Sequence, residues 1–246
     1  AQPAGEDLSE FAALLDQARE RERVLQLAYM YRYNPAFQFA LDQVRSGALG
    51  EIFEVDAVMS TEHSREYRDW LRHFKGGSMY IFGCHLIDLV ITLIGKPDRV
   101  VSFLKQTGHE NVAVCDTTLA VLEYPRGVST VRVSSVEVNG YGRRQLAILG
   151  TQGSIEIKPL ENPTRITYAK AGGGRIYCDR KEVVQLPPAT GRYDGLMRDF
   201  ALSVRGEKEN PFGYEHERIV HEATLQACGL TPGGTVFARM NPEDGT

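Results

Sequence analysis

Hydrophobic and polar residues follow two different periods along this chain, and the period changes near residue 98. Before that point, apolar residues recur at helical spacing in segments that begin near residues 8, 35 and 76. After it, short runs of strand-like alternation are separated by turn signals such as PRG, TQG and GGG. These runs are residues 98–106, 115–125, 128–138, 143–150, 154–159, 165–170 and 182–187.

This order of elements predicts an α+β fold. Consecutive strands after few helices indicate one large, mostly antiparallel sheet, with helices on one of its faces. Residues 51–60 supply a further strand, Asn34 and Pro35 form a helix start, and a short helix is expected around Trp70. Two amphipathic segments, 193–206 and 214–229, close the chain as helices.

The first 31 residues have a pattern of their own. Asp7 and Glu10 make a capping-box pattern before an apolar helical face that ends in the charged run RERER. The apolar run VLQLAYMY, residues 24–31, follows and is typical of a buried strand. A helix followed by a buried strand is the usual end of an α/β unit. We therefore divide the chain into residues 1–31 and residues 32–246.

Composition and charge exclude several classes of protein. The 246 residues are 42% hydrophobic and 24% charged, with a net charge of −4 and no basic stripe, which argues against a nucleic-acid partner. No apolar run approaches the roughly 20 residues of a membrane span, so a soluble protein is predicted. The four cysteines are far apart and include no CxxC pair, which is typical of reduced thiols in a cytoplasmic protein.

The segment GGSMYIFGCHLIDLVITLIGKP, residues 76–97, is the main candidate for chemistry. At helical spacing, Ile81, His85 and Asp88 fall on one side of an otherwise apolar helix. Because histidine titrates near neutral pH, His85 on a cleft wall would suit proton exchange with a hydroxyl group. The alternative is that His85 and Asp88 are hydrogen-bonded at a contact between helix and sheet.

Other kinds of site find little support. His216 and His221 are five residues apart, which does not place them on one helical face, and no HExxH motif is present. We therefore predict no metal site. The chain contains neither the G-x-S-x-G nor the G-x-G-x-x-G pattern, and the run Gly172–Gly174 fits a hairpin tip better than a phosphate cradle.

Three motifs together resemble the Gfo/Idh/MocA family of NAD(P)-dependent oxidoreductases. They are MYRYNPAF, GGSMYIFGCHLIDL and GTQGSIEI, and the resemblance covers nearly the whole chain. It implies a Rossmann domain followed by a substrate domain with an open sheet, through which many members pair. It also implies hydride transfer between NAD or NADP and a hydroxyl or keto group of a sugar, cyclitol or related small molecule.

The family's catalytic positions carry over only in part. Its histidine matches His85 and its final aspartate matches Asp88, and both are expected to be catalytic. The aspartate four residues before the histidine is replaced by Ile81, and the lysine beside the cofactor by Gln2. The resemblance also suggests substrate contacts, each with a plainer alternative as an ion pair, a packed ring or a surface charge, at Tyr31, Arg32, Trp70 and Lys75.

Three functions stay open at this point. The first is an oxidoreductase, or a fragment of one, for a small polyhydroxylated substrate. Its Rossmann domain would be represented only by residues 1–31, so the chain alone should bind no NAD(P)H. The second is a catalytically altered relative that serves as a sugar-binding and dimerisation module, which Ile81 and Gln2 favour. The third is a lyase or hydrolase that passes through a keto intermediate. A homo-oligomer through the open sheet face is expected.

Overall fold

Strands form one broad sheet in the computed structural model, which describes residues 3–171, 181–187, 191–231 and 234–236. Within these ranges the sheet has nine strands in the order β8-β7-β6-β5-β1-β4-β3-β2-β9. Neighbours are antiparallel except in the pairs β1–β4 and β2–β9, which are parallel. The bounds are β1 Ile52–Ser60, β2 Arg99–Lys105, β3 Thr117–Tyr124, β4 Gly127–Ser134, β5 Gln145–Gly150, β6 Gly153–Ile157, β7 Arg165–Lys170, β8 Glu182–Gln185 and β9 Gly234–Val236.

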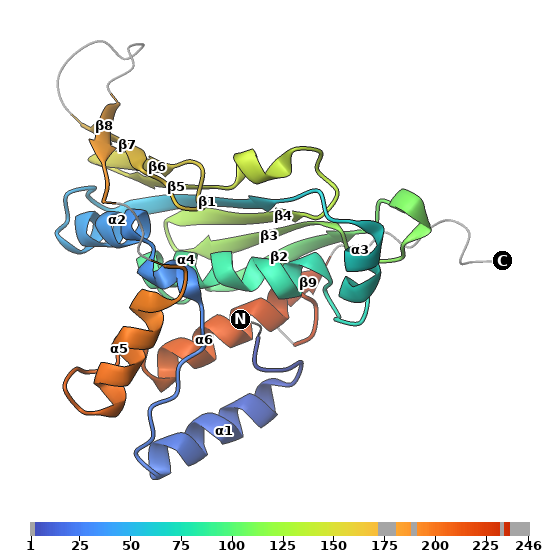
Figure 1. The fold of residues 1–246 in the computed structure, drawn as a ribbon, viewed down its shortest axis with the longest axis horizontal. Helices are drawn as coiled ribbons and strands as arrows, with labels where there is room; N and C mark the ends of the chain where they lie inside the picture. Colours follow the sequence, from blue (N-terminus) through green and yellow to red (C-terminus); the bar gives the residue numbers. More distant parts are fainter. Residues whose placement is uncertain (1–2, 172–180, 188–190, 232–233, 237–246) are drawn as a thin grey trace.

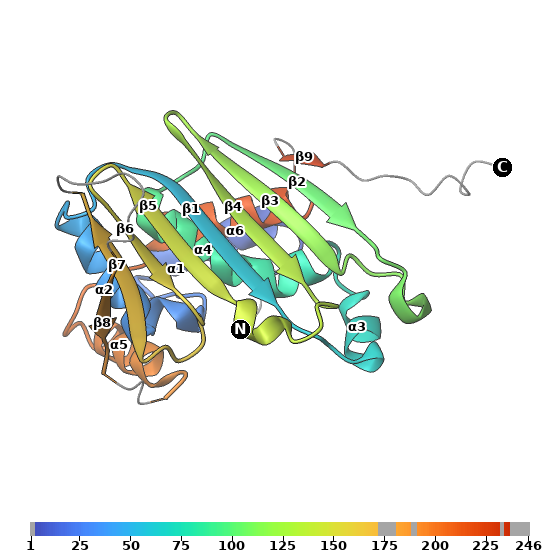
Figure 2. The same ribbon diagram turned by 90° about the horizontal axis from the view of Figure 1, so that it is seen from above.

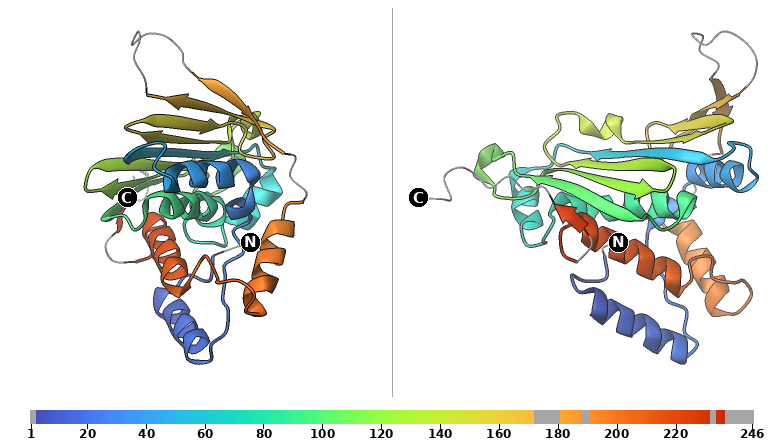
Figure 3. Two further views of the ribbon diagram at one scale, coloured as in Figure 1. Left: turned by 90° about the vertical axis from the view of Figure 1, so that its left-hand side faces the viewer. Right: turned by 180° about the vertical axis from the view of Figure 1, so that it is seen from behind.

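The α-helices lie on one face of this sheet in two layers (Figures 1 and 3). Helices α2 (Pro35–Arg45) and α4 (Cys84–Ile94) contact the strands directly, and α6 (Tyr214–Ala227) packs against α4 and β2. Helix α1 (Leu8–Glu20) forms an outer layer against α6, into which it buries Phe11 and Leu15. Helices α3 (Arg65–Leu71) and α5 (Asp194–Val204) lie at the periphery.

The core lies between the sheet and α4, because nine of the eleven residues of that helix are buried. On the strands, every second side chain faces this core, as the buried Thr118, Ala120 and Leu122 of β3 show. No α-helix of the described residues covers the opposite face, which Figure 2 shows from above. Acidic side chains such as Glu54 and Asp56 line a shallow hollow on that face.

Most of the predicted elements are present. The seven strand-like runs after residue 98 correspond to β2 to β8, and residues 51–60 correspond to β1. Asp7 caps α1 by accepting hydrogen bonds from the backbone N–H groups of Ser9 and Glu10. Asn34 caps α2 in the same way, through Ala36. The α+β fold class is therefore confirmed, and β9 is an addition that the sequence pattern did not predict.

The predicted strand over residues 24–31 is wrong. Residues 24–29 have no ladder partner, and a 3₁₀ turn, η1 (Met30–Tyr33), follows them. The apolar side chains of this run are half-buried at Val24, Leu25 and Leu27, and the backbone N–H of Leu27 donates to Glu217 Oε1 at 2.9 Å. Because no strand of the described residues lies beside it, the run satisfies its backbone elsewhere. The division at residue 31 stays a prediction.

Three further predictions concern cysteines, glycines and membranes. Cys84, Cys115 and Cys228 are free thiols, whereas Cys178 and the Gly172–Gly174 run lie outside the described residues. Within the described ranges, none of the helices is both long and apolar enough to cross a bilayer.

Candidate active site

A solvent-open hollow with a volume of about 420 Å³ lies at the end of β1, beside Met59 and Thr61. Parts of α3, the start of the α4 helix, the η4 turn (Gly140–Arg143) and the segment before α5 close around it. We call it the main hollow. Its lining residues are Met30, Tyr31, Met59, Thr61, Tyr67, Trp70, Ile81, Phe82, His85, Tyr141, Arg144, Arg192 and Tyr193.

A π-helical turn, η2 (Met79–Gly83), leads into α4 beside the main hollow. The chain enters it through Gly76 and Gly77, whose φ angles of 85° and 52° side chains rarely adopt. A Cβ atom at Gly83 would collide with the sulfur of Met79, so this glycine is required by packing inside the turn. Single π-turns within helices are often found at functional sites. Here the turn places both Ile81 and His85 on the wall of the main hollow.

His85 lines the main hollow but is only 5% exposed. The rings of Tyr29 and Tyr31 meet its imidazole edge-on, with centroids 5.4 and 5.8 Å away. Its Nδ1 atom is buried and has no hydrogen-bond partner in the described part of the chain. Burial lowers the pKa of His85 to about 4. The ring is therefore neutral at neutral pH, when it can hydrogen-bond a substrate hydroxyl, and it releases an accepted proton easily.

Asp88 does not orient His85. Its carboxylate receives hydrogen bonds from Arg32, with Nη2 to Oδ1 at 2.6 Å and Nε to Oδ2 at 2.9 Å. His216 Nε2 lies 3.3 Å from the same Oδ1. Burial alone would raise the pKa of Asp88, but the charge of Arg32 and the bond from His216 outweigh it and lower the pKa. Asp88 is thus an ionised partner of Arg32.

Arg32 was expected to contact substrate, and the structure places it in the interior instead. Its guanidinium bridges Asp88 and Glu217, with Nη1 to Glu217 Oε1 at 2.7 Å, and all three side chains are fully buried. Phe212 covers the guanidinium at 3.9 Å from its ring centroid. We call these three charged residues the Arg32 cluster. It ties the segment before α2 to α4 and α6, and it does not line the main hollow.

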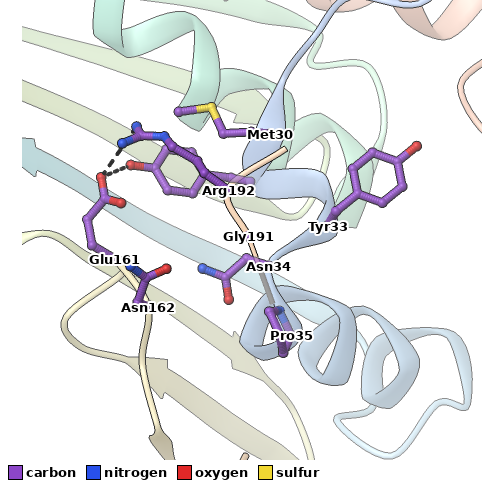
Figure 4. Close-up of a pocket in the computed structure, with 9 residues that line it drawn as sticks. Met30, Tyr33, Asn34, Pro35, Glu161, Asn162, Gly191 and Arg192 are labelled. Carbon is purple, nitrogen blue, oxygen red and sulfur yellow. Dashed lines mark hydrogen bonds and ion pairs between the residues drawn. The ribbon is translucent and has the colours of Figure 1, made fainter. Parts of the chain in front are cut away.

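A second polar cluster does reach the main hollow. Tyr31 donates its hydroxyl hydrogen to Glu161, and Arg144 Nη1 donates to the same carboxylate at 2.6 Å. Arg192 Nη2 lies 3.9 Å from Glu161 Oε1. We call these four residues the Glu161 cluster. Figure 4 shows Arg192 pointing toward Glu161 beside a smaller hollow. This smaller hollow shares Met30, Tyr31 and Arg192 with the main hollow.

Trp70 stands on the main hollow as predicted, and it belongs to a wall of rings. Tyr67, Trp70 and Phe82 form this aromatic wall, with Tyr67 and Trp70 centroids 5.3 Å apart and Trp70 38% exposed. His63 stacks between Tyr67 and Phe82, at 4.3 and 5.0 Å from their centroids. Flat faces of this kind can pack against a sugar ring or another flat ligand.

Lys75 and Gln2 do not contribute to the described site. The side chain of Lys75 is 71% exposed, pairs with Glu6 at 3.3 Å and does not line the main hollow. Gln2 lies outside the described residues. Within those residues, no group of three His, Cys, Asp or Glu side chains is placed to hold a metal ion. His221 is buried against Phe11, with 4.7 Å between the ring centroids.

Sequence reasoning missed Arg144, Glu161 and Arg192. They come from three loops of the chain, and only Arg144 lies in a run with strand-like alternation, the predicted strand 143–150. The sequence did contain one weak signal. Glu161 sits in the turn-rich stretch KPLENP, and a charge held in such a loop beside buried strands needs a partner.

The fold and the main hollow define an α+β domain with an open, mostly antiparallel sheet and a ligand-sized hollow at its end. Residues 37–156 match the model of one family, the GFO/IDH/MocA C-terminal domain. Over these residues the chain matches the C-terminal domain of the Gfo/Idh/MocA family.

Two proteins are related to this chain by sequence, and a solved structure is similar to it in fold. D-xylose 1-dehydrogenase (NADP⁺) 2 of Haloferax volcanii is 30% identical over 225 residues, which are 82% of this chain and 65% of that protein. An uncharacterised oxidoreductase of Rhizobium meliloti is 26% identical over 87% of this chain and 64% of its own length. The chain thus spans just under two thirds of both relatives. A solved complex of levoglucosan dehydrogenase with NADH and levoglucosan has the same fold, with a TM-score of 0.75, 18% identity, and coverage of 93% of this chain and 70% of that one.

Proposed function

We propose that this chain is the substrate-binding part of an NAD(P)-dependent oxidoreductase that acts on a hydroxyl or keto group of a sugar, cyclitol or related small molecule. The observation that supports this proposal most is that His85 lines the main hollow beside the aromatic wall. No Asp or Glu is among the described residues that line this hollow. The named activities of the Haloferax relative and of the levoglucosan enzyme are of the same kind.

The described residues fit the substrate side of such a reaction. His85 lines the main hollow and makes no hydrogen bond to another described residue through its buried Nδ1, which supports a role for the ring in proton exchange with the substrate oxygen. The aromatic wall offers a face for the substrate ring, and the hollow has the volume of a small-molecule site. The nicotinamide, when bound, supplies or accepts the hydride. We expect the chain alone to bind no NAD(P)H, which a fluorescence titration would measure.

The test is the substitution His85→Ala in a protein that joins this chain to a nucleotide-binding domain. We expect turnover of the preferred sugar to fall at least ~100-fold, the usual scale for loss of an acid–base group. NAD(P)H absorbance would follow the reaction. His109→Ala is the matched control, because His109 is well exposed and does not line the main hollow, so it should keep the parent rate. An unchanged rate in H85A would remove His85 from the mechanism.

One observation favours a second function, a sugar-binding and dimerisation module without turnover. Ile81 lies on the main hollow where the family motif has a carboxylate, and Asp88 is already bound to Arg32. His85 therefore has no acidic partner to orient it. Binding of sugars without any turnover by the joined protein would support this alternative. Sedimentation would test the predicted dimer through the open sheet face.

A further inference from the structure

The charges on the main hollow are all of one sign. Its lining includes the guanidinium groups of Arg144 and Arg192, and no Asp or Glu is among its lining residues. His85, the other titratable group of basic type there, is neutral at neutral pH. A hollow lined in this way has a positive potential and favours an anionic ligand over a neutral one of the same shape.

Arg144 keeps hydrogen-bonding capacity that the protein does not use. Its Nε donates to the carbonyl of Ser60 at 3.1 Å, Nη1 donates to Glu161, and Nη2 donates to Thr61 Oγ1. A guanidinium has five N–H groups, so two have no partner within the described residues. The side chain is only 10% exposed, and buried donors of this kind are normally paired.

Arg192 is held loosely and can move toward a ligand. Its side chain is 54% exposed, and its nearest carboxylate oxygen, Glu161 Oε1, is 3.9 Å away. That oxygen already accepts hydrogen bonds from Tyr31 and Arg144. Turning away from Glu161 would therefore cost Arg192 little, and a ligand carboxylate could accept two parallel N–H bonds from its planar guanidinium.

The number of charges indicates how much negative charge the ligand carries. The two arginines of the Glu161 cluster carry two positive charges, and Glu161 carries one negative charge. One positive charge is left over at this end of the main hollow. Nearby, burial and then the charge of Arg144 lower the pKa of His63 to about 4, which is consistent with a positive potential in this region.

We infer that the substrate is a hydroxylated ring bearing a carboxylate, such as a sugar acid, and that Arg192 together with Arg144 recognises this carboxylate. This inference rests on the proposed function and adds the charge of the substrate to it. The ring packs on the aromatic wall, and a ring hydroxyl faces His85. A single carboxylate neutralises the surplus charge, whereas a phosphate would bring about two negative charges.

The test compares three ligands that share one sugar ring and differ in the group at C6, which is neutral, a carboxylate or a phosphate, on the 246-residue chain at low ionic strength and neutral pH. D-Glucose, D-glucuronate and glucose 6-phosphate are the probes, with the galacto and manno series alongside, and ligand-observed NMR or calorimetry gives each Kd. We expect a uronate to bind about tenfold or more tightly than its hexose, and more tightly than the phosphate, because charge-assisted bonds are the stronger ones. Added salt should reduce this ratio.

Variants then assign the preference to its residues. Arg192→Gln should reduce the ratio of uronate to hexose affinity to about 1–3, and Arg192→Lys should give an intermediate ratio because a lysine keeps the charge without the planar pair of donors. Arg126→Gln is the control, since Arg126 is 79% exposed, pairs with Glu51 and does not line the main hollow, so it should keep the parent ratio.

The possible failures are distinguishable. Equal binding of hexose and uronate, stronger binding of the phosphate, or a ratio that persists in R192Q would overturn the inference and leave the proposed function standing. If no sugar of any charge binds while circular dichroism shows an intact fold, the proposed function fails, and the inference fails with it.

Discussion

Two polar clusters contain neighbouring residues of the chain but differ in their balance of charges, their exposure and their hydrogen bonding. Tyr31 belongs to the Glu161 cluster and Arg32 to the Arg32 cluster. In the Arg32 cluster, one guanidinium is shared between two carboxylates, and every side chain is fully buried. In the Glu161 cluster, one carboxylate is shared between two guanidinium groups, one of which is 54% exposed. The Arg32 cluster is closed to solvent, whereas the Glu161 cluster keeps N–H groups without an acceptor beside the main hollow.

The difference shows how one segment serves both stability and binding. The η1 turn gives its successive side chains different partners: Arg32 bonds Asp88 within the helix layer, whereas Tyr31 bonds Glu161 and lines the main hollow. Burial alone does not distinguish the two roles, because both residues are buried. The hydrogen-bond donors of the two clusters do distinguish them: the five N–H groups of Arg32 all have acceptors, whereas two N–H groups of Arg144 have none among the described residues.

The largest effect is expected from breaking the closed cluster. Arg32→Met leaves the carboxylates of Asp88 and Glu217 together in the interior without their cation. Removal of one partner from a buried ion pair costs about 3–5 kcal/mol. We therefore expect the free energy of unfolding, measured by urea denaturation followed by circular dichroism, to fall by about this amount.

A triple variant provides the control for that experiment. Arg32→Met combined with Asp88→Leu and Glu217→Leu removes all three charges, and apolar residues often replace buried ion pairs without loss. It should recover a large part of the stability that R32M loses. A single variant as stable as the parent chain would show that the Arg32 cluster contributes nothing to the fold.

A smaller effect is expected in the open cluster. Glu161→Gln keeps an acceptor for Tyr31 but removes the charge that faces Arg144, so we expect a loss of about 1–3 kcal/mol in the same denaturation experiment. Arg192→Gln is the matched comparison, since its partner is distant and its side chain is half-exposed. It should change stability by less than about 0.5 kcal/mol. Equal losses in E161Q and R32M would contradict the distinction between the clusters.

Acid titration distinguishes His85 on the main hollow from the Arg32 cluster by the pH range in which each loses its contribution to stability. Burial lowers the pKa of His85 from 6.5 to about 4, so between these values the unfolded chain binds more protons than the folded chain. Stability from this group is therefore lost as the pH falls from about 6.5 toward 4. The pKa of Asp88 is lowered from 3.8, so its contribution is lost only below that value. Urea midpoints at a series of pH values measure both windows. His85→Gln should reduce the upper one, which His63 and His221 share because burial lowers the pKa of each to about 4 as well.

The sequence predicted the fold well because its signals were local. Strand alternation after residue 98, the Asn34–Pro35 helix start and the Asp7 cap each depend on a few neighbouring residues, and all of them appear in the structure. The prediction for residues 24–31 was wrong because an apolar run forms a strand only where a neighbouring strand can pair with it. Its side chains are half-buried without joining the sheet.

The site was predicted less completely, since it depends on contacts between distant residues. His85, Tyr31 and Trp70, three of the expected site residues, line one hollow, and their roles stay predictions. Asp88 and Arg32 were expected at the substrate and form an interior ion pair instead, which no one-dimensional pattern reveals. Arg144, Glu161 and Arg192 meet only because three loops converge at the end of the sheet.

The π-helical turn at Met79–Gly83 has a consequence for how this site can diverge. Each residue of an α-helix turns the chain by about 100°, so the one extra residue in this turn fixes the azimuth of every side chain that precedes α4. Deletion of this extra residue would restore α-helical geometry. It would rotate Ile81 about the helix axis relative to His85, although neither side chain changes. Deletion of one residue from this turn would therefore change which side chain faces the main hollow.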